Sequence, residues 1–127
     1  MNACAPEKCG PVLIVEDEIV VALFLEDALA ELGYQVAGVA SRLDEAMART
    51  KAPDFAAAVL DVHLNGEDVF PLADRLAELQ LPFIFATGHG ARGIPARHAD
   101  RPVLQKPFLP ADLAKLLIDV TSGPFLK

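Results

Sequence analysis

The chain has 127 residues, of which 53% are hydrophobic and 6% aromatic, and this is enough to build the aliphatic core of one domain. Its aliphatic runs are too short to cross a bilayer, so we expect no membrane segment. The formal net charge of -7 repels phosphate backbones, and Lys and Arg do not gather into a basic face, which argues against direct DNA binding.

The amino-terminal stretch MNACAPEKCG lacks the basic region, the apolar stretch and the cleavage site of a secretory signal, so we expect a cytoplasmic protein. We expect a flexible leader over residues 1–10, one domain over 11–122 and a tail over 123–127. Cys4 and Cys9 fall in the leader and have no second pair with which to form a zinc site, so we assign them no role.

The stretch PVLIV, residues 11–15, predicts a strand buried on both faces, and it ends abruptly at Glu16-Asp17-Glu18. Apolar residues at helical spacing then predict a helix over residues 17–32, with Gly33 as its C-cap. These apolar positions are Val21, Leu25, Ala28 and Leu32.

The next pair of elements is a short strand in YQVAGVA, residues 34–40, and a helix in SRLDEAMARTKA, residues 41–52. We predict Ser41 as the N-cap of this helix, because its hydroxyl can accept from an unpaired backbone N–H. Asp44 or Glu45 in the first turn would complement the helix dipole.

The third strand is predicted in DFAAAVLDVHL, residues 54–64, and its aliphatic part ends at Asp61. A turn at Asn65-Gly66 leads into a helix, and PFIFAT, residues 82–87, is the fourth strand. The apolar face of the helix is formed by Val69, Leu72, Ala73, Leu76 and Leu79.

The segment 88–101 carries three glycines, a proline and no sustained apolar period, so we expect the fourth helix to be short, poorly formed or missing. The stretch PVLQ, residues 102–105, predicts a fifth strand. PADLAKLLIDV, residues 110–120, predicts a closing helix that begins at Pro110, an early helical position that tolerates proline.

Strand and helix alternate five times with short connections, which predicts an α/β fold: a doubly wound, five-stranded parallel sheet with helices on both faces. In such a sheet the ligand lies beyond the carboxyl ends of the strands, where the strand order reverses. The side chains that follow the strands should therefore meet at one edge.

Those side chains are the carboxylates of Glu16, Asp17 and Asp61, the hydroxyl of Thr87 and the ammonium of Lys106. Grouped carboxylates repel one another unless a cation neutralises them, and Mg²⁺ accepts oxygen ligands while leaving positions for a phosphoryl group. An aspartate there can act as a nucleophile, while the lysine and the threonine contact the transferred oxygens. The pattern predicts a phosphoryl-transfer site.

From Pro11 to Val120 the chain resembles the receiver domain of two-component response regulators. Four stretches carry the resemblance, and they are VEDE, LDVHLNGED, FATG and LQKPF, in this order and at these spacings. The resemblance implies the flavodoxin-like (βα)5 fold, a self-phosphorylating signalling protein that is not otherwise an enzyme, and a cis peptide before Pro107. It also implies the roles of six residues. Asp61 is the phosphoacceptor, Thr87 the switch hydroxyl and Lys106 the partner of the phosphoryl group, and the Mg²⁺ ligands are Glu16, Asp17, Asp61 and the backbone carbonyl of His63.

Receivers usually carry an aromatic residue on the fifth strand that rotates as the threonine moves, but Val103 stands at that position here. Together with the glycine-rich segment after Thr87, this resembles the stand-alone receivers known by the Phe-Ala-Thr-Gly signature. In that subgroup the second residue after the threonine is often tyrosine. Here it is His89, and the sequence leaves open whether its ring takes over the switching.

His63 and His89 each lie two residues after a site residue, Asp61 and Thr87 respectively. One hypothesis is that the pair sets the lifetime of the phosphorylated state by holding or obstructing the attacking water. The alternative is that both are solvent-facing loop residues without effect. We expect His98, in an Arg-rich loop, to lie on the surface.

The predicted partners are a sensor histidine kinase or phosphotransfer protein and an unidentified downstream protein. Ile19, Val20, Leu23 and Phe24 make the first helix apolar beyond its core face, which indicates a docking surface unless the chain's own termini cover it. The chain ends soon after its last helix, so we expect output through protein contact rather than an effector domain. Dimerisation on phosphorylation, and whether the chain is part of a longer protein, stay open.

Three function classes remain. The favoured one is a single-domain response regulator, acting as an intermediate that passes the phosphoryl group on or as a phosphate sink. The second is a metal-dependent phosphohydrolase, although such enzymes usually need an acidic residue where His63 stands. The third is a pseudo-receiver adaptor that binds partners without being phosphorylated.

Overall fold

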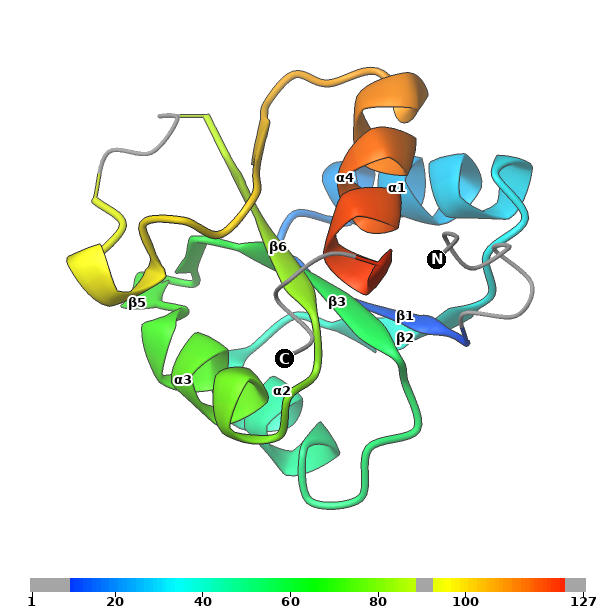
Figure 1. The fold of residues 1–127 in the computed structure, drawn as a ribbon. Helices are drawn as coiled ribbons and strands as arrows, with labels where there is room; N and C mark the ends of the chain where they lie inside the picture. Colours follow the sequence, from blue (N-terminus) through cyan, green and yellow to red (C-terminus); the bar gives the residue numbers. More distant parts are fainter. Residues whose placement is uncertain (1–9, 89–92, 123–127) are drawn as a thin grey trace.

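The computed structural model describes residues 10–88 and 93–122 (Figure 1). Five parallel strands form the central sheet in the order β2-β1-β3-β6-β7, which confirms the predicted doubly wound topology. The strands are β1 (Val12–Val15), β2 (Val36–Ala40), β3 (Ala57–Asp61), β6 (Phe83–Thr87) and β7 (Val103–Gln105). The strand order reverses between β1 and β3, so the crevice for a ligand lies beyond their carboxyl ends.

Helices cover both faces of the sheet (Figure 1). The helices α1 (Ile19–Glu31) and α4 (Pro110–Ser122) pack on one face, and α2 (Leu43–Arg49) and α3 (Phe70–Glu78) pack on the other. Strands β1, β3 and β6 are buried along their whole length, because both of their faces are covered. This explains why their sequences are continuous aliphatic or aromatic runs.

The end of α1 confirms the role predicted for Gly33. Its φ of 92° lies in the left-handed region that glycine enters without steric cost. Gly33 N–H donates to the carbonyl of Ala30, and Tyr34 N–H donates to the carbonyl of Leu29. These two bonds form a Schellman motif, which ends the helix and turns the chain toward β2.

The prediction of Ser41 as the N-cap of α2 is wrong. The helix begins one residue later than expected, with Arg42 at the cap position and no capping bond from a side chain. Instead, the backbone N–H of Ser41 donates to the Glu45 carboxylate at 3.0 Å. Asp44 and Glu45 do lie in the first turn, as predicted.

A small hairpin follows β3 and was not predicted. Its strands are β4 (His63–Leu64) and β5 (Glu67–Asp68), which pair antiparallel. The turn falls at Asn65 and Gly66 as expected, with φ angles of 51° and 80°. Two successive residues with positive φ match a type I′ turn, for which Asn-Gly is the preferred sequence.

In the described part of the segment between β6 and β7, the only helical element is the 3-10 turn η2 (Ala96–His98). This agrees with the expectation that the fourth helix is short. No helix among the described residues is long and apolar enough to cross a membrane. The leader with Cys4 and Cys9, the residue His89 and the tail 123–127 lie outside the described residues, and the statements about them stay predictions.

Candidate functional site

Three carboxylates meet at the carboxyl edge of the sheet. Glu16 and Asp17 follow β1 and Asp61 ends β3, and these strands are adjacent and in register. One oxygen from each of the three carboxylates lies within 4.8 Å of the others. Glu16 and Asp61 are buried, with exposed fractions of 2% and 8%. Such a set of hard oxygen donors fits a divalent cation such as Mg²⁺.

Lys106 reaches the same point from the loop after β7. Its Nζ lies 2.9 Å from Glu16 Oε1 and 3.5 Å from Asp61 Oδ1. The peptide bond between Lys106 and Pro107 is cis, as the resemblance implied. The ammonium group therefore contacts two of the three carboxylates directly.

Thr87 ends β6 and is buried. Its carbonyl accepts a hydrogen bond of 2.9 Å from the Lys106 N–H, so the two strand ends are joined through the backbone. The Gln105 side chain donates to the carbonyl of Gly88 at 3.1 Å, which ties β7 to the first residue after Thr87. A hollow of about 400 Å³ opens here, and it is lined by Asp17, Glu18, Asp61, His63, Thr87, Gly88 and Lys106.

The crowding of charge shifts the pKa values of the site. Burial, assisted by the neighbouring Glu16 carboxylate, raises the pKa of Asp61 to about 7, although Lys106 acts in the opposite direction. Burial acts to lower the pKa of Lys106, but its contacts with Glu16 and Asp61 outweigh burial and raise it. Near neutral pH these shifts leave Asp61 partly protonated and Lys106 charged.

The pKa of Asp17 shifts in the direction opposite to that of Asp61. Burial acts to raise its pKa, but hydrogen bonds, first among them one of 2.9 Å from the Asn65 N–H, outweigh burial and lower it. The Asn65 side chain donates to the carbonyl of Ser41 at 2.8 Å. Local sequence identifies Asn65 only as a turn residue, because these contacts join residues that lie 48 and 24 positions apart.

His63 lies on β4 beside the hollow, and its side chain is largely exposed. Its Nδ1 lies 3.5 Å from Asp68 Oδ1, the carboxylate opposite it in the hairpin. The imidazole can therefore be oriented by Asp68, which lies seven positions after Asp61 in the sequence.

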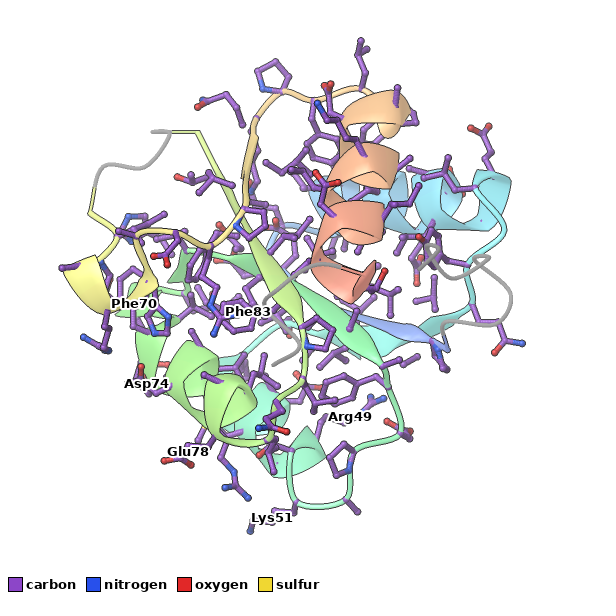
Figure 2. All side chains as sticks on the ribbon, viewed as in Figure 1. Arg49, Lys51, Phe70, Asp74, Glu78 and Phe83 are labelled. Atoms are coloured by element: carbon purple, nitrogen blue, oxygen red, sulfur yellow. The ribbon has the colours of Figure 1, made fainter. Side chains whose placement is uncertain are left out.

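The prediction that His98 lies on the surface is wrong. The residue is 4% exposed, and its Nε2 lies 2.7 Å from Asp74 Oδ1 of α3. Arg97 also donates to this carboxylate, from Nε to Oδ1 at 2.8 Å and from Nη2 to Oδ2 at 3.0 Å. The hydrogen bond from Arg97 is the main cause that lowers the pKa of Asp74. The His98 ring packs among the rings of Phe70, Phe83 and Phe85. Three of the residues that contact it, Phe70, Asp74 and Phe83, are labelled in Figure 2. These contacts anchor η2, beyond the segment that follows Thr87, to helix α3.

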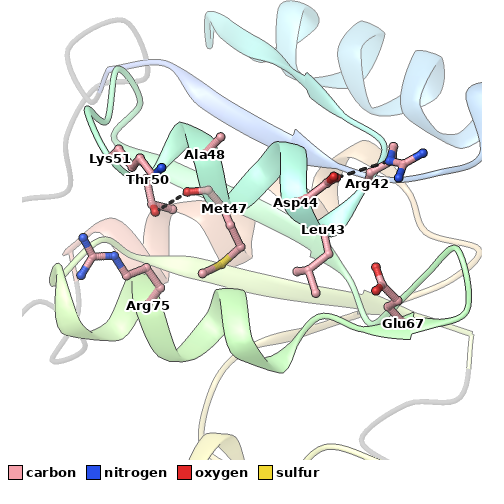
Figure 3. Close-up of a pocket in the computed structure, with 9 residues that line it drawn as sticks. All are labelled: Arg42, Leu43, Asp44, Met47, Ala48, Thr50, Lys51, Glu67 and Arg75. Carbon is pink, nitrogen blue, oxygen red and sulfur yellow. Dashed lines mark hydrogen bonds and ion pairs between the residues drawn. The ribbon is translucent and has the colours of Figure 1, made fainter.

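A second hollow, of about 570 Å³, lies between α2 and α3 (Figure 3). Leu43 and Met47 line it together with basic side chains. Arg42 pairs with Asp44 at 3.3 Å, and Arg75 pairs with Glu78 at the same distance. Because Arg42 and Arg75 are each paired with an acidic side chain of their own segment, we assign this groove no chemistry.

The fold and the site together define a doubly wound α/β protein with an acidic cluster and a lysine at the carboxyl edge of its sheet. Residues 12–118 match the family described as the response regulator receiver domain. The chain belongs to this family.

Two relatives are similar to the chain. The phyllosphere-induced regulator PhyR of Methylorubrum extorquens is 28% identical over 117 residues, which are 89% of this chain and 44% of PhyR, so the chain spans less than half of that protein. A solution structure of SdrG from Sphingomonas melonis Fr1 is 43% identical with a TM-score of 0.77, and the match covers 85% of this chain and 92% of SdrG. The BeF3-activated conformation of SdrG, from Pseudomonas melonis Fr1, is 42% identical with a TM-score of 0.73 over 84% and 92% of the two chains.

Proposed function

We propose that this receiver accepts a phosphoryl group onto Asp61, from a sensor histidine kinase or a phosphotransfer protein, in a Mg²⁺-dependent reaction in the cytoplasm. The observation that carries the proposal is the convergence of three carboxylates within 4.8 Å with a lysine 3.5 Å from Asp61. The likeness to SdrG, which has a BeF3-activated conformation, supports the same reaction. Beyond its own phosphorylation and dephosphorylation, we assign the chain no enzymatic turnover.

Glu16, Asp17, Asp61 and the backbone carbonyl of His63 would hold the metal. When bound, Mg²⁺ supplies positive charge that offsets the carboxylates and the phosphoryl oxygens. The geometry supports this assignment, because one oxygen from each of Glu16, Asp17 and Asp61 lies within 4.8 Å of the others, and Lys106 is the cation that contacts Glu16 and Asp61.

The chain's own residues account for the transfer. A carboxylate oxygen of Asp61 attacks phosphorus, the bond between phosphorus and the donor's histidine nitrogen breaks, and the electron pair stays on that nitrogen. The attack requires ionised Asp61, and its pKa of about 7 makes the proton easy to remove near neutral pH. The Lys106 ammonium, already beside Asp61, would pair with the new phosphoryl oxygens.

The switch would run through Thr87. Its hydroxyl would move toward the phosphoryl group and displace the segment that follows Thr87. On β7, Val103 occupies the position of the usual aromatic partner. The contacts of His98 with α3 would hold η2 in place during this movement. The signal would then pass to an unidentified downstream protein by direct contact.

The phosphodonor would dock on α1. Ile19, Val20 and Leu23 are exposed by 76, 78 and 54%. A groove of about 470 Å³ continues this apolar surface toward the site, and it is lined by Val20, Val21, Phe24, Lys106, Pro107 and Phe108. An apolar surface that ends at Lys106 suits a donor whose phosphorylated histidine must approach Asp61.

Intact-mass spectrometry after incubation with acetyl phosphate and Mg²⁺ tests the proposal. We expect a gain of one phosphoryl group in the wild type and in Asp68→Asn, an exposed control on strand β5. We expect no gain in Asp61→Asn or with a chelator. No gain in the folded wild type, with acetyl phosphate or with a phosphorylated donor, would favour a pseudo-receiver adaptor. Sustained hydrolysis of a small phosphate ester would favour a phosphohydrolase.

A further inference from the structure

Asn65 bonds two strand ends at the mouth of the acidic site. Its backbone N–H donates to Asp17 Oδ2 at 2.9 Å, and its side-chain Nδ2 donates to the carbonyl of Ser41 at 2.8 Å. Asp17 follows β1, and Ser41 follows β2. The tip of the β4–β5 hairpin is thus attached to both neighbouring strands through a single residue.

The backbone conformation of Asn65 makes this bridge possible. Its φ of 51° lies in the left-handed region, where asparagine is tolerated better than most side chains, and Gly66 follows with a φ of 80°. A proline at position 65 would have no N–H and would require a φ near -65°. The bond to Asp17 therefore depends on the residue type and on the turn type together.

The carboxylates of the acidic cluster have two different partners, the charged Lys106 and a neutral backbone N–H. Lys106 lies 2.9 Å from Glu16 and 3.5 Å from Asp61, whereas the Asn65 N–H contacts Asp17. Because the three carboxylates repel one another, a fixed donor on Asp17 keeps it from turning away into solvent. The side-chain bond to Ser41 in turn keeps that donor in place.

We propose that Asn65 is a positioning residue that orients the Asp17 carboxylate for divalent-metal binding, and that its side-chain amide does so through the Ser41 carbonyl. This inference rests on the proposed function of the site. Groups that orient a metal ligand typically contribute about 10- to 100-fold to metal affinity. The loss of the amide alone should fall at the lower end of that range, because the backbone N–H remains.

The test is a Mg²⁺ titration without any phosphodonor. Binding is measured by calorimetry or from the NMR shifts of the backbone amides around the site. Asn65→Gly keeps the N–H and the positive φ but removes the bond to Ser41, and we expect its Kd for Mg²⁺ to rise about 10-fold. The control Gly66→Asn changes the same turn while leaving both bonds of Asn65 intact, and its Kd should match the wild type.

Phosphorylation rates then separate positioning from a direct role. At saturating Mg²⁺, Asn65→Gly should be phosphorylated by acetyl phosphate as fast as the wild type, because only metal binding has weakened. An unchanged Kd in Asn65→Gly, an equal loss in Gly66→Asn, or a slower rate at saturating Mg²⁺ with unchanged Kd would each overturn the inference. A wild type that neither binds Mg²⁺ nor gains a phosphoryl group would instead overturn the proposed function.

Discussion

In the absence of metal, Asp61→Asn should stabilise the protein above neutral pH. Asp61 has a folded-state pKa of about 7 against an ordinary value of 3.8, chiefly because it is buried. At a pH between these two pKa values, Asp61 therefore keeps its proton in the folded protein but has lost it in the unfolded chain. Stability from this group is full below about pH 4 and falls as the pH rises to about 7. Asparagine does not ionise, so the variant does not lose stability in this pH range.

The size of the effect follows from the separation of the two pKa values. About three pH units at about 1.4 kcal/mol each give an upper limit of about 4 kcal/mol. The variant also loses the attraction between Asp61 and Lys106, 3.5 Å away, which offsets part of the gain. We expect a net gain of about 1–3 kcal/mol at pH 8, or roughly 3–5 °C in Tm for each kcal/mol in a domain of this size.

Thermal and urea denaturation at pH 5 and pH 8 in the presence of a chelator would measure the effect. Asp119→Asn is the matched control, because it makes the same chemical change at an exposed position of α4. Mg²⁺ at ten times its Kd should then raise the unfolding free energy of the wild type by about 1.4 kcal/mol. The same concentration should not stabilise Asp61→Asn. If Asp61→Asn is no more stable than the wild type at pH 8, or gains equally at pH 5, the electrostatic reasoning is wrong.

Three further predictions follow from the packing and the loops. Leu76→Ala on α3 removes a fully buried side chain and should cost about 2–5 kcal/mol of unfolding free energy in urea denaturation; a loss below about 1 kcal/mol would contradict its place in the core. Asp74→Ala leaves the buried His98 without its partner and should cost about 1–3 kcal/mol in the same assay, while an unchanged midpoint would refute the anchoring of η2. His63→Ala and His89→Ala should change the autodephosphorylation rate, followed by the decay of the phosphorylated mass, and unchanged rates in both would show that neither imidazole affects the attacking water.

The sequence predicted the sheet and most of the site because both depend on local patterns. Buried parallel strands need continuous apolar runs, and each run here ends where a polar side chain begins. Once the alternation of strands and helices gave a parallel sheet, Asp61, Thr87 and Lys106 had to lie at one edge. Gly33 was predictable for the same reason, since a helix that ends on glycine needs only local geometry.

The errors concern contacts that the local sequence pattern did not specify. His98 looked like a loop residue because its neighbours in the sequence are polar, but η2 packs on α3, where Asp74 and three phenylalanine rings bury the His98 side chain. Ser41 looked like an N-cap, but its N–H bonds to Glu45 and its carbonyl accepts from Asn65. Neither partner could be inferred from spacing alone.

By itself, the sequence determined the alternation of strands and helices, the parallel sheet, and the residues that end each strand, because hydrophobic period and turn residues act over a few positions. Only the tertiary structure decided how the charges at that edge are shared. Burial raises the pKa of Asp61, Lys106 pairs with Glu16, and Asn65 holds Asp17. These relations depend on distances across the fold, which local patterns do not encode.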